Sequence, residues 1–283
     1  MLHRTSQTAA GLVLSSSLTS ILAATRERLF KIGACDWSIG KMADPGCFAV
    51  AKEIGLDGVQ VSLGTVQDDM KLRQMKVQQE YKNAAKAASV EIASLAIGEL
   101  NNIPYKSDPR TEAWVSDSVD VMEALGLKTV LLAFFGKGDL VGDDEGKTEV
   151  VRRLKKVAPK AEKAGVFLGL ESWLTAEDTL RIMDRVGSPA VKMYYDVRNS
   201  TERGYDVLKE IRMLGKDRIC EFHLKENGCL LGKGPVNFEK VRDTIHDIGY
   251  EGWMQIEGGL PPNGDVVESC RSNLKLLRGL FSA

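Results

Sequence analysis

The segment Ile219-Cys-Glu-Phe-His-Leu-Lys225 alternates between apolar and ionisable side chains from Cys220 onward. In an extended strand, its apolar face begins at Cys220, and its polar face carries Glu221, His223 and Lys225. A parallel sheet that helices cover on both sides should be apolar on both faces. A polar face on such a strand therefore indicates a closed barrel, whose axis collects the polar groups.

Three further segments, at 166–172, 191–197 and 252–257, repeat this alternation. Each places a carboxylate on its polar face close to its carboxyl end. These carboxylates are Glu171, Asp196 and Glu257. The repetition makes the polar face a property of a whole group of strands, not of a single one.

Eight short apolar or β-branched segments alternate with longer segments of helical periodicity. The predicted strands are 31–37, 58–63, 91–97, 128–135, 166–172, 191–197, 219–225 and 252–257. Several helical segments stop at a glycine just before the next strand, as at Gly55, Gly126, Gly165 and Gly249. Eight such units in about 250 residues predict an α/β fold, a single-domain (β/α)8 TIM barrel over residues 30–283. An open doubly wound sheet is the alternative, but Gly-x-Gly-x-x-Gly is missing after the first strand.

Residues 1–29 differ in character from the rest of the chain. A basic start, a mildly apolar middle rich in Ser and Thr, and small residues near Ala23 and Ala24 resemble an export signal. A plain N-terminal extension explains the same residues equally well. The first interpretation places the protein in the periplasm or outside the cell, and the second in the cytoplasm.

The composition of the chain argues against several classes of binding partner. The formal net charge of −1 argues against nucleic acid, because phosphate binding usually needs a basic surplus. No apolar stretch approaches the ~20 residues of a membrane span. The five cysteines show no CxxC spacing and give no disulfide framework. We expect a small-molecule partner, and self-association into a homo-oligomer is compatible with the sequence.

Four residues are predicted to meet at the carboxyl ends of neighbouring strands, where barrel active sites are built. They are Glu171, Asp196, His223 and Glu257. Three crowded carboxylates would repel one another unless a cation lay between them. One imidazole with three carboxylates suits one divalent metal, with Mn²⁺ expected first and Mg²⁺, Co²⁺ or Zn²⁺ as alternatives.

Several strings carry a resemblance to the xylose isomerase-like barrel family. They are Leu170-Glu-Ser-Trp173, Tyr194-Tyr-Asp-Val-Arg-Asn199, Phe222-His-Leu-Lys-Glu226, Leu231-Gly-Lys-Gly-Pro-Val-Asn-Phe238 and Gln255-Ile-Glu-Gly258. The resemblance runs from about residue 31 to the end and is strongest after Gly165. It implies a sugar or sugar phosphate isomerase or epimerase. In family epimerases, the glutamates that match Glu171 and Glu257 move the proton between opposite faces of the sugar.

Five residues are expected to contact the substrate. Lys225 and Asn199 would bind polar groups, Trp37 and Trp173 would wall the pocket, and Gln60 would contact a hydroxyl. Ketose 3-epimerases commonly carry Asp-x-x-His where this chain has Asp196-x-x-Asn199, so an imidazole is missing there. Arg198, where many relatives have Gly, is expected to be a surface charge, and contact with a substrate phosphate or carboxylate is the alternative.

Three other functions compete with isomerisation. A metal-dependent lyase of the inosose or dehydroshikimate dehydratase type would use the same four residues. A phosphodiesterase like endonuclease IV shares the barrel but needs a His-rich site, and this chain has three histidines. A non-catalytic sugar-binding protein would not need a carboxylate-rich metal site.

Overall fold

The computed structural model describes residues 29–281, and their eight strands close into one parallel barrel in the order β1 to β8. The strands are β1 (Phe30–Cys35), β2 (Gly58–Ser62), β3 (Glu91–Ile97), β4 (Thr129–Phe134), β5 (Phe167–Ser172), β6 (Val191–Asp196), β7 (Ile219–Glu226) and β8 (Gly252–Gly258). β8 pairs with β1, so the ring has no free edge. The predicted (β/α)8 barrel is confirmed, and the predicted strands differ from the observed ones by at most two residues at either end.

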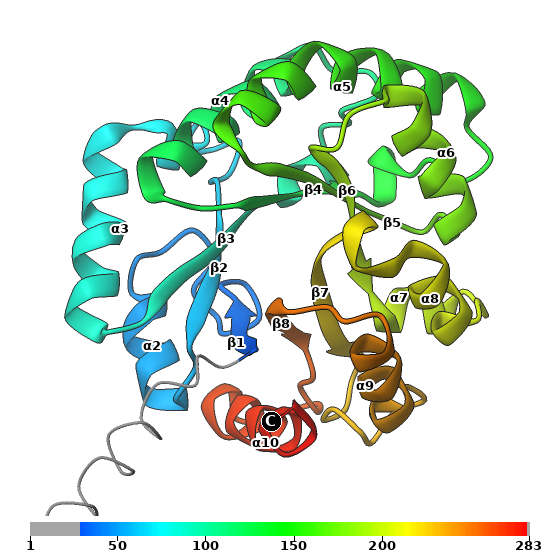
Figure 1. The fold of residues 1–283 in the computed structure, drawn as a ribbon. Coiled ribbons are helices and arrows are strands. Elements are labelled where there is room, and N and C mark those ends of the chain that lie inside the picture. Colours follow the sequence, from blue (N-terminus) through cyan, green and yellow to red (C-terminus); the bar gives the residue numbers. More distant parts are fainter. Residues whose placement is uncertain (1–28, 282–283) are drawn as a thin grey trace, which may run out of the picture. The chain divides into compact units, whose positions relative to one another are not determined.

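Helices surround the ring, and Figure 1 shows them outside the strands. The α-helices are α2 (Cys47–Ile54), α3 (Met75–Ala88), α4 (Arg110–Leu125), α5 (Asp144–Ala164), α6 (Ala176–Val186), α7 (Val197–Glu202), α8 (Val207–Arg218), α9 (Phe238–Asp247) and α10 (Val266–Phe281). Short 3-10 helices lie at η1 (Lys71–Arg73), η2 (Gly98–Asn101) and η3 (Gly136–Gly138). Gly55, Gly126 and Gly165 end their helices in the left-handed conformation, as their positions predicted.

Alternation along the late strands divides the core into two layers. Outward side chains such as Phe222 and Met254 join the large apolar cluster beneath the helices. A small cluster around Leu131 and Tyr194 fills the barrel interior. The polar faces of β5 to β8 therefore point to the axis, and this positions the site.

The alternation predicted that Cys220 lies on the outward face of β7, and this prediction is wrong. A bulge interrupts the pairing of β6 with β7, where Met193 pairs with Ile219 and Tyr194 with Glu221. Cys220 is the extra residue, and its side chain packs against the interior cluster that includes Tyr194. One additional residue in a strand reverses the face of its neighbour, which periodicity alone does not show.

Two features bear on the expectations about location. Among the helices that the structure describes, none is both long enough and apolar enough to cross a membrane. The predicted leader, residues 1–29, lies outside the described residues apart from Leu29. The boundary between leader and barrel therefore stays a prediction.

Candidate active site at the carboxyl end of the barrel

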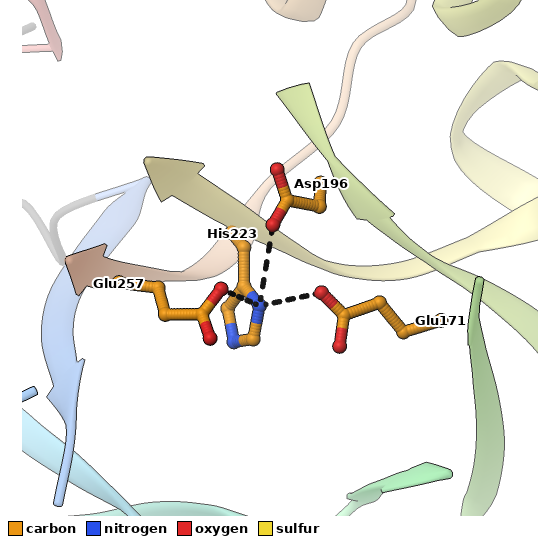
Figure 2. A group of neighbouring side chains, drawn as sticks. All are labelled: Glu171, Asp196, His223 and Glu257. Atoms are coloured by element: carbon orange, nitrogen blue, oxygen red, sulfur yellow. Dashed lines mark hydrogen bonds and ion pairs between the residues drawn. The ribbon is translucent and has the colours of Figure 1, made fainter. Parts of the chain in front are cut away.

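The four predicted ligand residues meet at the ends of β5, β6, β7 and β8. Their candidate ligand atoms all lie within 4.8 Å of one another. Nδ1 of His223 lies 3.0 Å from Oε1 of Glu171, 3.2 Å from Oε2 of Glu257 and 4.0 Å from Oδ2 of Asp196. Figure 2 shows Glu171 and Glu257 reaching the imidazole from opposite sides. The two glutamates thus flank a centre formed by His223 and Asp196.

Asp196 has a second task that fixes its orientation. It is the N-cap of α7, and its Oδ1 accepts hydrogen bonds from the backbone N–H groups of Arg198 and Asn199, both at 2.8 Å. An N-cap carboxylate satisfies helix donors that otherwise have no partner. Oδ1 is thereby occupied, and Oδ2 is left facing His223.

Glu257 is held by two side chains that also line the site. Nε1 of Trp37 donates to its Oε1 at 3.0 Å, and Nζ of Lys225 lies 2.8 Å from its Oε2. The same ammonium lies 3.5 Å from Oδ2 of Asp196. Lys225 therefore neutralises part of the carboxylate charge, and its ammonium is already paired with Glu257 and Asp196.

Burial and charge act differently on the two carboxylates. Burial raises the pKa of Asp196 to about 8, although Lys225 opposes the shift. Burial alone would also raise the pKa of Glu257, but His223 and Lys225 outweigh it and hold that pKa well below its ordinary value. Glu257 is consequently ionised at neutral pH.

A divalent cation fits this arrangement. Oδ2 of Asp196 and Oε2 of Glu257 are buried, and only the ion-pair contacts with Lys225 and His223 reach these two oxygens among the described residues. Metal–oxygen and metal–nitrogen bonds of ~2.1 Å put adjacent octahedral ligands ~3.0 Å apart and opposite ligands ~4.2 Å apart. The distances from Nδ1 of His223 to the three carboxylates, 3.0 to 4.0 Å, lie within this range. One imidazole and three carboxylates are also the hard donor set that Mn²⁺ and Mg²⁺ accept.

A pocket of about 410 Å³ opens directly above these residues. Of the predicted substrate-binding residues, four line it: Trp37, Trp173, Asn199 and Lys225. Glu171 and Glu257 form part of its wall, and Glu99, Asn101 and Asn102 contribute polar groups from the other side. Phe135 packs edge-on against Trp173, with ring centroids 5.3 Å apart. Polar groups therefore share the wall with an apolar aromatic surface.

Gln60, expected to contact the substrate, does not reach the pocket. Its side chain is fully buried on the barrel axis, where Oε1 lies 2.9 Å from Nε2 of His223. The sequence placed it within the second predicted strand but could not give its depth in the barrel. A residue in the middle of a short strand and one at its carboxyl end look alike in sequence, and only the strand stagger of a barrel gives their different depths.

Arg198 is not the surface charge that was expected. Its side chain is largely buried, and its Nε lies 3.1 Å from Oε2 of the fully buried Glu226. Glu226 in turn accepts a hydrogen bond from the backbone N–H of Val236, in the loop after β7. Gly234 lies so close to this carboxylate that an added Cβ would come within 2.2 Å of it. Arg198 thus belongs to the framework of that loop.

The β1–α2 loop, which carries Trp37, depends on a residue that sequence analysis missed. Asp36 is fully buried, and its Oδ2 accepts hydrogen bonds from the backbone N–H groups of Ala43 and Ser62, at 3.0 and 2.8 Å. Its Oδ1 accepts from the Ser62 hydroxyl at 2.7 Å. Burial raises the pKa of Asp36 to about 6, with these hydrogen bonds opposing the shift. An Asp directly after an apolar strand was the available sequence signal.

Replacing Asp36 with Ala is expected to lower the free energy of unfolding by about 2–4 kcal/mol, because it leaves two buried N–H groups without an acceptor. Thermal unfolding should move down by roughly 2–4 °C per kcal/mol. Asp36→Asn is the matched control, since its amide oxygen can still accept from both N–H groups. Equal destabilisation by Asn and Ala would show that the charge, and not the accepted hydrogen bonds, holds the loop.

Comparison with known proteins identifies the family of the barrel. The model of the xylose isomerase-like TIM barrel family matches residues 48–277. An Escherichia coli K12 protein provisionally named L-ribulose-5-phosphate 3-epimerase is 24% identical over 257 residues, which cover 81% of this chain and 89% of that protein. The 2-epi-5-epi-valiolone 7-phosphate 2-epimerase of an Actinoplanes species is 24% identical over 212 residues, 73% of this chain and 76% of the relative.

Solved structures share the fold. The D-psicose 3-epimerase of Clostridium cellulolyticum H10, crystallised with D-tagatose, superimposes with a TM-score of 0.75 at 16% identity. The match covers 89% of this chain and 99% of that one. With the family model spanning most of the barrel, the chain belongs to the xylose isomerase-like TIM barrel family.

Proposed function

We propose that this protein is an isomerase-class enzyme, a divalent-metal-dependent epimerase or isomerase of a sugar that works by proton transfer through an enediolate. The observation that carries the proposal is the pair Glu171 and Glu257, which flank His223 and Asp196 at the base of the pocket. The names of the relatives, which are sugar epimerases, support the reaction class. Mn²⁺ is the proposed metal, because the donor set holds one nitrogen and otherwise carboxylate oxygens.

Each residue has a role in this scheme. A bound divalent cation would polarise the carbonyl and stabilise the developing enediolate by several kcal/mol. Glu257, kept ionised by its neighbours, removes the proton from one face of the reacting carbon. Glu171 approaches from the opposite side and returns a proton to the other face, which inverts the configuration. Return of the proton to the neighbouring carbon gives an aldose–ketose isomerisation instead.

The pocket wall favours a sugar without phosphate. Among the described lining residues Lys225 is the only cation, and Glu257 and Asp196 already hold its ammonium. Glu99, Glu171 and Glu257 add negative charge. A phosphate monoester would lose water here without gaining the charge-assisted hydrogen bonds that usually bind it. The aromatic side chains can instead cover the apolar face of a neutral sugar ring.

We therefore expect a free sugar to have at least ten-fold higher kcat/KM than its own phosphate ester. The measurement compares the two forms of each active sugar at one Mn²⁺ concentration. Lys225→Met, which removes the cation, should not shift the ratio of the two kcat/KM values toward the ester. Preference for the ester in the wild-type protein would contradict this description of the pocket.

The proposed reaction is tested with a panel of ketoses, aldoses and inososes incubated with the Mn²⁺-loaded protein, with products identified by NMR. We expect a stereoisomer or an aldose–ketose pair of unchanged mass. A product lighter by one water, with the absorbance of an enone or enol, would identify a lyase on the same site. No conversion of any member, by a protein that binds Mn²⁺, would contradict the sugar assignment.

A further inference from the structure

The fully buried residues beneath His223 form a hydrogen-bonded chain that leads from one carboxylate to the imidazole. We propose that Gln60 sets the tautomer of His223, and that Glu221 fixes the orientation of Gln60 through the hydroxyls of Ser94 and Tyr194. Gln60 is then a positioning residue, which keeps Nδ1 of His223 available as a metal ligand. This inference rests on the metal site of the proposed function.

The chain of donors begins at Glu221. Its Oε2 receives three donors: the Ser94 hydroxyl at 2.9 Å, the Tyr194 hydroxyl at 3.0 Å and Nε2 of Gln255 at 3.3 Å. As an ionised carboxylate, Glu221 can only accept hydrogen bonds. The hydroxyl hydrogens of Ser94 and Tyr194 therefore both point toward Glu221.

Both hydroxyls then offer only lone pairs to the side chain above them. The amide of Gln60 lies 3.2 Å from the Ser94 oxygen and 3.0 Å from the Tyr194 oxygen. Only the NH₂ end of the amide can donate to two acceptors, so this end faces Ser94 and Tyr194. The carbonyl oxygen of Gln60 must face the other way.

That oxygen determines which imidazole nitrogen carries hydrogen. Oε1 of Gln60 lies 2.9 Å from Nε2 of His223, and the Cys35 thiol also donates to it at 3.2 Å. An amide oxygen has no hydrogen to donate, so Nε2 of His223 is the donor. In the neutral imidazole, the lone pair is then on Nδ1, which faces Glu171 and Glu257.

The opposite orientation of the Gln60 amide would prevent His223 from binding a metal through Nδ1. An NH₂ group against Nε2 would force the imidazole hydrogen onto Nδ1, and Nδ1 could not then bind a cation. The ring is also held from the side, because Tyr194 packs against His223 with ring centroids 4.5 Å apart. Position and tautomer of the imidazole are thus both determined by residues that never reach the pocket.

Gln60→Met is the direct test, since it removes the acceptor but keeps the length and burial of the side chain. We expect the dissociation constant for Mn²⁺ to rise about 10–100-fold, as for other groups that orient metal ligands. In the Zn²⁺-loaded protein labelled with ¹⁵N-histidine, wild-type His223 should carry hydrogen on Nε2 and bind through Nδ1. The variant should lose this single pattern.

Two single variants and their combination give a second test, which does not depend on the folding of Gln60→Met. Ser94→Ala and Tyr194→Phe each leave Gln60 one acceptor, so each should change Mn²⁺ affinity less than about three-fold. The double variant should approach Gln60→Met, because the NH₂ group of Gln60 then has neither of its two acceptors. Gln78→Met, in α3, is the control for a buried Gln whose amide donates to the Leu72 carbonyl far from the site.

The outcomes separate the two proposals. Wild-type Mn²⁺ affinity and an unchanged ¹⁵N pattern in Gln60→Met, or in the double variant, would overturn the role of Gln60 and leave the proposed function intact. A wild-type protein that binds no Mn²⁺ would overturn the proposed function itself. A loss of Mn²⁺ affinity in Gln78→Met equal to that in Gln60→Met would also overturn the role of Gln60, because it would show that lowered stability alone weakens metal binding.

Discussion

Replacing Glu171 or Glu257 with Gln is expected to lower turnover by at least the ~10²–10⁴-fold that general acid–base catalysis supplies. The amide keeps an oxygen beside His223 but cannot take a proton. The affinity for Mn²⁺ should fall only in part, because Asp196, His223 and one glutamate remain. Steady-state turnover at saturating Mn²⁺ is the measurement, with metal affinity determined separately.

The two glutamine variants also report on the two faces of the sugar. Each should retain exchange of a substrate proton with D₂O from the face whose glutamate survives. Glu99→Gln is the matched control: a carboxylate of the same pocket that lies outside the cluster of four, and it should keep turnover within about ten-fold. Near wild-type turnover of Glu171→Gln or Glu257→Gln at saturating metal would show that the replaced glutamate binds metal but does not transfer the proton.

His223→Asn should behave differently from the glutamine variants. It removes the one nitrogen donor of the proposed metal site, Nδ1 of His223, which lies 3.0 to 4.0 Å from the three carboxylates, and it leaves both proposed proton-transfer glutamates in place. We expect Mn²⁺ affinity to fall by at least 10-fold, and activity at low Mn²⁺ to fall with it. Excess Mn²⁺ should restore at least part of the turnover, measured as activity against metal concentration.

His246→Asn is the control for this variant. His246 lies in α9, where its exposed ring packs against Phe30 and Phe281. Its replacement should lower stability without changing the dependence of activity on Mn²⁺. A His223→Asn protein that stays inactive at every Mn²⁺ concentration, though folded, would assign His223 a part in the chemistry.

The barrel could be predicted because its strands and helices have different periods. The alternation in 219–225, the glycines that end helices and the count of eight units all follow from local geometry. The convergence of Glu171, Asp196, His223 and Glu257 followed as well, because carboxyl ends of neighbouring parallel strands must meet. Local pattern and topology were sufficient for this part of the site.

Depth within the barrel could not be predicted in the same way. Gln60 and Lys225 both lie on inward faces, yet one is buried beneath His223 and the other lines the pocket. The bulge at Cys220 and the ion pair of Arg198 with Glu226 depend on strand stagger and loop packing. These relations join residues far apart in the sequence, and no periodicity records them.

The most direct test of the account follows solvent deuterium. A sugar converted by the Mn²⁺-loaded protein in D₂O should gain one deuterium, at the carbon beside the carbonyl, and NMR locates it. Protein stripped of metal should give neither conversion nor deuterium. Conversion of the sugar without any deuterium from solvent would contradict proton transfer by Glu171 and Glu257.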